Sequence, residues 1–453
     1  MKKLISPNAA YILNLLHTHG YEAFFVGGCV RDYLLNRTIN DYDITTSALP
    51  EQMVNLANSE NINIITSGIK HGTVAFILNK EVIECTTYRT EGKYSDNRHP
   101  DKVSFTTSLK DDLIRRDFTI NALCYDGEKI IDYTNGINDL NNHIIRAIGD
   151  ADKRFKEDAL RIMRAIRFSC TLHFDIDPDT LTSIINNSYL LNNIARERIR
   201  DELIKILESD EENILIKLKS GNVLHYIIKE YQLIYDITQE TPYHIYNVFD
   251  HCNVALNASI GSNYIIRTAV LLHDIGKSFH KTFDENGVCH FKGHAKKSAE
   301  LSRQILNNLK YSRKDINYIC KLIFYHDYYL KDDNKVIRKF LYKLNGDIKL
   351  AKDILQLQIF DNMGKNPAII DEKNGIIYKA INRINQMEIN HECFCIKDLK
   401  INGHDLIDLD YPANKIGECL DYILRHILNQ QDKNNREYLL KYIRRNKDEI
   451  LNC

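Results

Sequence analysis

Apolar and polar positions divide the chain into a mixed N-terminal part and a long helical remainder. Short apolar or alternating runs predict strands over residues 21–26, 41–45, 72–78, 81–87 and 102–107. Short helices are predicted over residues 30–35 and from Leu49-Pro50 onward, because proline is favoured in a first helical turn. These elements alternate only within residues 1–146, which we therefore expect to form an α/β domain.

Two further stretches extend this pattern toward the helical part. Residues 89–100 are rich in Gly, Ser, Asp and Asn and predict a long loop. Arg115-Arg116-Asp117 is expected to open a helix-like segment that runs through Asn121 to Leu123. From Asp152 onward the pattern is helical, and no internal repeat interrupts it.

The first buried strand ends in Gly27-Gly28, directly before a short predicted helix. Glycine lets the backbone approach a ligand closely, and a helix N-terminus suits phosphate. Asp41 and Asp43 follow, two residues apart on a predicted strand, so both carboxylates lie on one face. Mg²⁺ would relieve their repulsion. A tight turn and a solvated acidic pair are the ordinary explanations, but this order and spacing favour metal-assisted phosphoryl or nucleotidyl transfer.

Glu84, on the predicted strand over residues 81–87, can bring a third carboxylate to this pair. Its spacing fits a polar residue on the solvent face of a sheet equally well.

A dense charge pattern follows in a predicted helix over residues 157–167, where Asp158 is succeeded by Arg161, Arg164 and Arg167. At 3.6 residues per turn, Asp158 and Arg161 are neighbours, whereas Arg167 has moved toward the other side. The alternative is a solvated ridge of ion pairs. A second basic helix is predicted over residues 194–207.

The helical remainder carries a dispersed histidine and aspartate series: His251, His273-Asp274, His294, His326 and Asp361. A single buried histidine is usually a hydrogen-bonded core residue. The His273-Asp274 pair, however, directly follows Leu271-Leu272, where ionisable groups are costly unless they are neutralised. A bound metal would neutralise them.

Composition narrows the function classes. The chain has 453 residues, which is enough for several domains, and a net charge of −1, so RNA would be bound through local patches. Its 11 cysteines are scattered without a Cys-x-x-Cys pair, which favours a reducing compartment. No apolar run approaches the roughly 20 residues of a membrane span. We therefore expect a cytoplasmic protein without membrane contact.

Taken together, the motifs resemble those of bacterial tRNA nucleotidyltransferases, the CCA-adding enzymes, a class shared with bacterial poly(A) polymerases. The resemblance covers nearly the whole chain and rests on five runs: Gly27-Gly28-x-Val30-Arg31-Asp32 with Asp41-x-Asp43; Glu84-x-Thr86-Thr87-Tyr88-Arg89 with Tyr94, Asp96 and Arg98-His99-Pro100; Arg115-Arg116-Asp117-Phe118-Thr119-x-Asn121-Ala122; Glu157-Asp158-x-x-Arg161-x-x-Arg164-Ala165-x-Arg167-Phe168; and Arg196-Glu197-Arg198-Ile199 with Glu202-Leu203. Within the histidine and aspartate series, His251, His273-Asp274 and Asp361 resemble the metal-binding set of the HD superfamily, whereas His294 and His326 are weaker ligand candidates.

The resemblance implies an α+β fold with a small nucleotidyltransferase head and an otherwise all-helical chain. It divides the chain into a catalytic head over residues 1–146, a nucleotide-selecting neck over 147–208, a body with an HD-type metal-binding domain over 209–380, and a tRNA-binding tail over 381–453. The oligomeric state stays open.

The family resemblance also implies roles for individual residues. Gly28, Arg31 and Arg116 would contact the incoming nucleotide, and Asp41 and Asp43, with Glu84, would form the catalytic Mg²⁺ site. Asp158 and Arg161 would read the base, with Arg164 and Arg167 nearby. A second divalent metal would be held by the HD set: His251, His273, Asp274 and Asp361.

Base selection also follows from hydrogen-bond polarity. A carboxylate beside a guanidinium offers an acceptor and a donor, which match the amino group and ring nitrogen of cytosine and of adenine. Uracil and guanine present the reverse order and would leave charged groups unpaired. We therefore expect addition of C, C and A to the tRNA 3′ end from CTP and ATP. The alternatives are an A-adding enzyme or poly(A) polymerase, an HD-type metal-dependent phosphohydrolase, and a structural RNA-binding protein.

Overall fold

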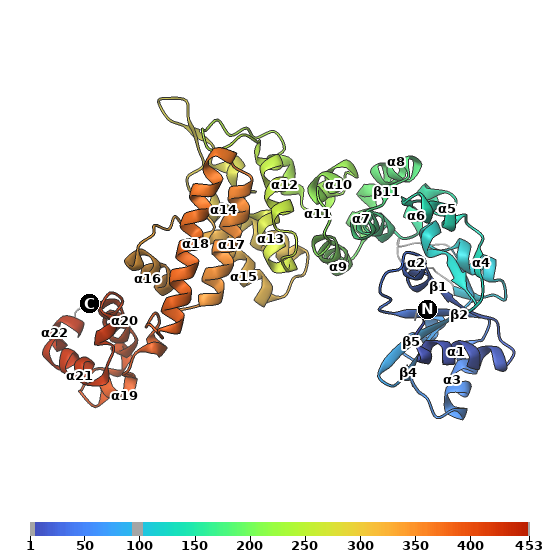
Figure 1. The fold of residues 1–453 in the computed structure, drawn as a ribbon, viewed down its shortest axis with the longest axis horizontal. Helices are drawn as coiled ribbons and strands as arrows, with labels where there is room; N and C mark the ends of the chain where they lie inside the picture. The colour runs from blue at the N-terminus through green and yellow to red at the C-terminus, as the bar shows by residue number, and fades with distance from the viewer. Residues whose placement is uncertain (1–4, 93–102, 452–453) are drawn as a thin grey trace. The chain divides into compact units, whose positions relative to one another are not determined.

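The computed structural model describes residues 5–92 and 103–451 and divides into two compact units, Met1–Lys229 and Glu230–Cys453 (Figure 1). The first unit mixes strands and helices, and the second is almost entirely helical. The α+β expectation is confirmed. Among the described residues, no helix has the length and apolar character needed to cross a membrane.

A seven-stranded sheet forms the centre of the first unit. In spatial order its strands are β3 (Asn63–Ile65), β4 (Thr73–Leu78), β5 (Glu81–Thr87), β2 (Tyr42–Thr46), β1 (Ala23–Val26), β8 (Leu123–Tyr125) and β9 (Ile130–Asp132). Within this sheet, among the described residues, only β2 and β5 pair in parallel, and their register places Asp43 directly opposite Glu84. On β5, buried Ile83, Cys85 and Thr87 alternate with outward residues, so Glu84 lies on the open face.

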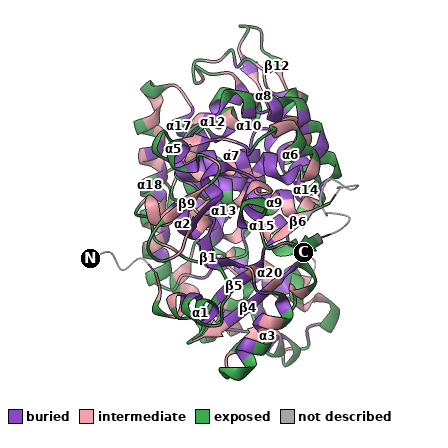
Figure 2. Cartoon of the chain, turned by 90° about the vertical axis from the view of Figure 1, so that its right-hand side faces the viewer, coloured by how far each residue is buried: buried purple, intermediate pink, exposed green. Residues whose placement is uncertain are grey.

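Five helices accompany this sheet: α1 (Pro7–Thr18), α2 (Gly28–Leu34), α3 (Pro50–Ser59), α4 (Leu109–Ile114) and α5 (Gly136–Asn141). Helix α1 packs on β1, β2 and β5, while α2 packs on β1, β2 and β8. Buried positions follow the strands and the inward helix faces in Figure 2.

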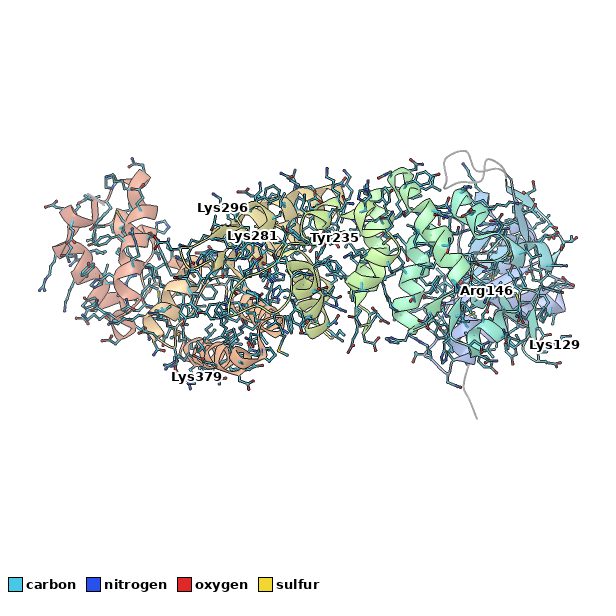
Figure 3. The ribbon with its side chains drawn as sticks, turned by 90° about the horizontal axis from the view of Figure 1, so that it is seen from above. Lys129, Arg146, Tyr235, Lys281, Lys296 and Lys379 are labelled. Atoms are coloured by element: carbon cyan, nitrogen blue, oxygen red, sulfur yellow. The ribbon has the colours of Figure 1, made fainter. Side chains whose placement is uncertain are left out.

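The rest of the first unit consists mainly of α6 (Ala151–Glu157), α7 (Leu160–Leu172), α8 (Pro178–Asn187), α9 (Arg196–Leu207), α10 (Ile214–Ser220) and α11 (Leu224–Ile227). Helix α7 packs against α9, and α6 packs against α8. The side chain of Arg146, labelled in Figure 3, pairs with Asp139 on α5 and with Asp177, the N-cap of α8. This pairing joins the sheet domain to the helices that follow it.

Local predictions in this unit are wrong at three places: residues 115–123, the start of residues 89–100, and residues 157–167. The segment from Arg115 to Leu123 is not one helix, because α4 ends at Ile114 and is followed by a 3₁₀ turn (Thr119–Asn121) and then by β8. The predicted loop at 89–100 begins instead with strand β6 (Arg89–Glu91), which pairs with β7 (Val103–Phe105). Residues 93–102, which include the Tyr94, Asp96 and Arg98-His99-Pro100 positions, lie outside the described residues.

The predicted helix over residues 157–167 is also interrupted. Asp158 has an extended backbone (φ −134°, ψ 104°) at the end of α6, and α7 begins only at Leu160. Its carboxylate Oδ1 accepts a hydrogen bond from the Leu160 amide at 3.0 Å, which competes with helical continuation. Asp158 and Arg161 are therefore not helical neighbours.

The second unit contains helices α12 (Val248–Ala258), α13 (Tyr264–Leu272), α14 (His294–Asn308), α15 (Arg313–Tyr325), α16 (Asn334–Lys343), α17 (Ile348–Met363) and α18 (Pro367–Ile389), followed by α19 (Gly403–Ile407), α20 (Ile416–Ile427), α21 (Arg436–Arg445) and α22 (Lys447–Leu451). A hairpin of β12 (Thr282–Phe283) and β13 (Cys289–His290) interrupts the expected helical run. Residues between Cys393 and Ile450 share a hydrophobic core of their own.

Candidate functional site

The predicted glycine turn lies against an arginine. Gly27 has φ +77°, which side chains with a Cβ rarely adopt, and a Cβ there would lie 3.4 Å from Arg116 Nη1. The turn therefore brings the start of α2 and the Arg116 guanidinium together. Among the described residues, the buried Arg116 Nε has no hydrogen-bond partner. An unpartnered buried donor of this kind is what an incoming anion would satisfy.

A chain of polar contacts joins two of the predicted nucleotide-binding arginines. Arg31 donates to Asn121 Oδ1 at 2.8 Å, and Asn121 donates to Asp117 at 3.2 Å. Asp117 accepts in turn from Arg164 Nε at 2.7 Å. Burial opposes ionisation of Asp117, but the Arg164 and Arg161 guanidiniums lower its pKa to about 2. One buried carboxylate thus aligns α2 with α7.

Phe168 completes this arrangement. The guanidiniums of Arg31, Arg164 and Arg167 lie 5.1, 5.3 and 4.0 Å from its ring centroid. Each distance is within cation–π range, so the ring holds three like charges side by side. Arg167 also pairs with Glu202 on α9.

Carboxylates gather on the open face of the sheet. Asp43 and Glu84 are cross-strand partners, and Asp41 directly precedes β2 rather than lying within it. Burial raises the pKa of Asp43 to about 6, with smaller contributions from the charges of Glu84 and Asp41 and against the opposing charge of Arg116. The three predicted carboxylates therefore act on one another electrostatically, and a bound cation would relieve their repulsion.

Arg116 is held by a carboxylate that the sequence analysis did not assign. Asp112 on α4 accepts from Arg115 Nη2 at 2.7 Å and lies 3.4 Å from Arg116 Nη2. It also accepts from the Thr45 hydroxyl at 3.1 Å. The signal was present in the sequence, because Asp112 stands three and four residues before the two arginines.

The predicted base-reading pair is not joined in this structure. Asp158 pairs with Arg198 on α9 at 3.1 Å, whereas Arg161 pairs with Glu157 at 3.1 Å and donates to the Arg115 carbonyl. Within the described part of the chain, no ion pair joins Asp158 to Arg161. Arg198 and Glu157 are thus positioned to orient this pair, and neither was assigned a role from sequence.

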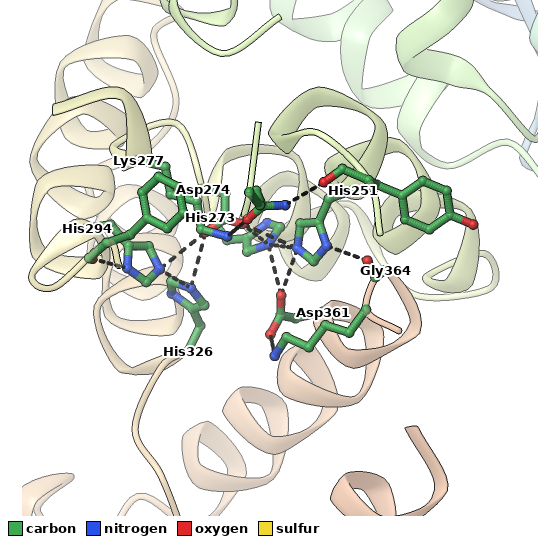
Figure 4. A network of polar contacts seen from close by, with 12 residues as sticks. His251, His273, Asp274, Lys277, His294, His326, Asp361 and Gly364 are labelled. Carbon is green, nitrogen blue, oxygen red and sulfur yellow. Dashed lines mark hydrogen bonds and ion pairs between the residues drawn. The ribbon is translucent and has the colours of Figure 1, made fainter. Parts of the chain in front are cut away.

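The second unit brings together all six residues of the histidine and aspartate series (Figure 4). His251 Nε2 lies 2.9 Å from Asp361 and 3.3 Å from Asp274, and His273 Nε2 lies 3.3 Å from Asp274. The predicted HD set therefore converges, and all of its members are buried. Burial opposes protonation of His273, but the two carboxylates outweigh it and raise its pKa to about 10.

Two lysines accompany this cluster. Lys277 Nζ lies 2.7 Å from Asp274, and Lys365 Nζ lies 2.6 Å from Asp361. A cavity of about 240 Å³ opens onto both lysines and both aspartates. Its lining combines metal-ligand side chains with cations that suit a phosphate.

Three family models match the chain. The poly A polymerase head domain covers residues 23–146, the model described as "Probable RNA and SrmB- binding site of polymerase A" covers 173–234, and tRNA nucleotidyltransferase domain 2 covers 288–443. Residues 23–146 thus match the head domain of poly A polymerases, the class of nucleotidyltransferase to which the sheet and its carboxylates correspond.

Curated proteins with similar sequences narrow the class of protein further. The chain is 51% identical over 196 residues to the CCA-adding enzyme of Lactobacillus helveticus and 47% identical over 212 residues to that of Enterococcus faecalis. These alignments cover 43% and 46% of the chain, and the chain spans about half the length of the curated relatives, 48% and 51%.

A solved structure, the CCA-adding enzyme of Bacillus stearothermophilus in complex with CTP, matches with a TM-score of 0.72 over the full length of both chains at 27% identity. A CCA-adding enzyme from Thermotoga maritima, complexed with tRNA, shares the fold with a TM-score of 0.57 at 20% identity over 97% of this chain and 96% of that one. The chain is therefore similar to tRNA nucleotidyltransferases, including CCA-adding enzymes, over the regions that these comparisons cover.

The buried Asp112 generates a stability prediction. Asp112→Asn keeps the shape but removes the charge that compensates Arg115 and Arg116. Breaking a buried pair in this way costs about 3–5 kcal/mol. We expect the free energy of unfolding of the first unit to fall by that order in urea titration. Asp111→Asn is the matched control, since Asp111 is the exposed neighbour on the same helix. Equal effects of the two variants would contradict this role.

Proposed function

We propose that the chain adds C, C and A to the 3′ end of tRNA from CTP and ATP. The observation that carries the proposal is the meeting, within one compact unit, of paired carboxylates with a guanidinium network. Full-length similarity to a CCA-adding enzyme in complex with CTP supports it. An A-adding enzyme or a poly(A) polymerase would use the same groups. An incorporation assay on tRNA that lacks its CCA end distinguishes these two activities from CCA addition.

The head carboxylates are proposed to hold Mg²⁺. Asp43, Glu84 and Asp41 fit such an ion because Asp43 and Glu84 lie opposite each other on neighbouring strands, and because the charges of Glu84 and Asp41 add to the burial that raises the pKa of Asp43. When bound, the ion activates the tRNA 3′-hydroxyl and stabilises the departing pyrophosphate. Arg116 and Arg31 would bind the triphosphate, and Gly28 lies beside Arg31, whose Nη2 would be 3.7 Å from an added Cβ.

Base selection is proposed to depend on Asp158 and Arg161, with Arg164 and Arg167 close to the nucleotide. Asp158 would accept from the amino group of cytosine or adenine, and Arg161 would donate to the adjacent ring nitrogen. Arg198 holds the Asp158 carboxylate through both guanidinium nitrogens, at 3.1 and 3.4 Å. The acceptor is thus oriented before a base arrives.

The body is proposed to hold a separate divalent metal through His251, His273, Asp274 and Asp361. An HD-type phosphohydrolase activity is the second candidate function, and the cavity that combines these aspartates with Lys277 favours it. The tail over residues 381–453 is proposed to contact tRNA, and its Arg444 and Arg445 are exposed.

The carboxylate site makes a direct prediction. Asp43→Asn should slow incorporation of both CTP and ATP on the order of 10³-fold, because the ion contributes several kcal/mol to the transition state. Binding of tRNA, measured by filter retention, should stay unchanged. Glu128→Gln, in an exposed turn of the same head, should incorporate normally. Residual incorporation near the wild-type rate would refute the metal site.

Arg198 makes a prediction about selection. Arg198→Met keeps the length of the side chain but releases the Asp158 carboxylate, so KM for CTP and ATP should rise about 10-fold. Discrimination against UTP should weaken in parallel. Arg200→Met, on the same helix but paired with Asp201, serves as the control. An unchanged KM, measured by single-nucleotide incorporation, would show that Arg198 is only structural.

Exchanging the base-reading pair tests hydrogen-bond polarity. Asp158→Arg with Arg161→Asp alone should fail with all four triphosphates, because the new arginine would face Arg198. Adding Arg198→Glu restores opposite charges, and this triple variant should prefer UTP and GTP over CTP and ATP. The measurement is incorporation of each triphosphate alone onto tRNA ending in CC. Continued preference for CTP and ATP would move base reading to other residues.

A further inference from the structure

A cavity in the first unit lies beside the residues that are proposed to read the base. It has a volume of about 230 Å³, and its polar lining comes from Thr90, Asp111, Arg115, Lys153, Arg154 and Glu157. The nucleotide contacts proposed above use none of these side chains. Pockets that enclose drug-sized ligands measure about 300–1,000 Å³, so a cavity of this size suits a single base with its ribose.

Glu157 is shared between this cavity and Arg161. Its Oε2 accepts from Arg154 Nη1 at 2.7 Å and from Arg161 Nη1 at 3.1 Å. Arg161 Nη2 also donates to the backbone carbonyl of Arg115 at 3.1 Å, and Arg115 lines the cavity as well. The guanidinium of Arg161 is thus held by two residues of the cavity wall. An occupant of the cavity would lie next to the incoming base.

The backbone break at Asp158 gives two neighbouring carboxylates separate directions. Glu157 is the last residue of α6, whereas Asp158 has an extended backbone and pairs with Arg198 on α9. Glu157 pairs instead with the arginines three residues before it and four residues after it, Arg154 and Arg161. One acidic dipeptide therefore serves two adjacent positions, with the incoming base on the Asp158 side and the cavity on the Glu157 side.

The cavity presents an open acceptor and an open donor. Among the described residues, neither Glu157 Oε1 nor Arg154 Nη2 takes part in a hydrogen bond, although Oε2 and Nη1 of the same groups bond to each other. Arg154 Nε donates to the Ile148 carbonyl at 3.3 Å, which anchors the guanidinium. The exposed ammonium of Lys153 has no partner in the described part of the chain either. Acceptor, donor and cation are all free to meet a ligand.

We propose that this cavity binds the 3′-terminal nucleotide of the tRNA, and that Arg154 and Glu157 read its base. The inference rests on the proposed function, but it concerns the strand that is extended rather than the triphosphate that is added.

The position of the cavity fits the nucleotide that is extended. The terminal 3′-hydroxyl forms its bond to the α-phosphate of the incoming nucleotide as pyrophosphate leaves, so the two nucleotides must lie side by side. On the base side, Glu157 directly precedes Asp158. On the phosphate side, Arg115 directly precedes Arg116, which is proposed to bind the triphosphate. The cavity therefore adjoins the incoming nucleotide at both ends.

Hydrogen-bond polarity predicts which terminal base fits. A carboxylate acceptor with a guanidinium donor matches the amino group and ring nitrogen of cytosine or adenine, whereas uracil and guanine would leave charged groups unpaired. A tRNA that has received its C residues ends in C. The cavity would therefore favour a correct intermediate over one that ends in a misincorporated U or G. Because Lys153 is exposed, solvent reaches the cavity, and we expect modest discrimination of about 10-fold.

Primers that differ only in the last base test the proposal. The full-length chain is given tRNA ending in CC or in CU, and ATP incorporation is measured over a range of tRNA concentrations. We expect kcat/KM to be about 10-fold higher for the CC end. Arg154→Met removes the donor, so this preference should be lost and KM for the CC primer should rise, while KM for ATP stays unchanged. Arg154→Lys keeps one donor and should retain part of the preference.

Two lysines of the same helix separate base reading from charge. Lys153→Met removes a cation that would contact the phosphate of the terminal nucleotide, so KM should rise equally for both primers. Lys156→Met is the matched control, because Lys156 is exposed on α6 but does not line the cavity. This variant should use both primers as the unchanged chain does.

Each possible failure has a distinct result. Equal use of the CC and CU ends by the unchanged chain would overturn the reading of the terminal base and leave CCA addition in place. A preference that survives Arg154→Met would overturn the role of the cavity. So would a rise in KM for ATP alone, which is the result expected if Arg154 only supports Glu157 and Arg161. Absence of incorporation onto any primer would overturn the proposed function, and this inference with it.

Discussion

The proposed nucleotide site depends on buried carboxylates that allow several arginines to lie close together. Asp117 compensates Arg164 and orients Asn121, and Asn121 in turn fixes Arg31. Asp112 does the same for Arg116. Without such partners, guanidiniums packed around a glycine turn would repel one another in a low-dielectric setting. Each compensated arginine keeps its charge and gains a fixed direction, which is what binding a flexible triphosphate requires.

Much of the sheet could be predicted because strand periodicity is local. The strand over residues 81–87 has the predicted limits, and its alternation placed Glu84 on the face that Asp43 shares. The break at Asp158 could not be predicted from spacing, because it depends on a carboxylate competing for the Leu160 amide. Helical spacing made Asp158 and Arg161 neighbours, whereas in the structure their side chains pair with Arg198 and Glu157 instead of with each other.

Ion pairs between residues that lie far apart in the sequence could not be predicted from it either. Arg198 meets Asp158 only because α7 packs on α9, and no local pattern announces that pairing. The histidine series was recognisable because ionisable residues in apolar surroundings need an explanation. Its division into two pairs, His251 with His273 and His294 with His326, was not recognisable, since it depends on how four helix ends converge in space.

The backbone of the second unit is built to hold these imidazoles before any ion binds. An added Cβ at Gly364 would lie 2.5 Å from His251 Nδ1, so the carbonyl that orients this ring can approach only because the residue is glycine. Fixed rings lose little entropy when a ligand binds. A metal of the proposed kind would therefore meet side chains whose directions folding has already fixed, and its binding would stabilise this unit.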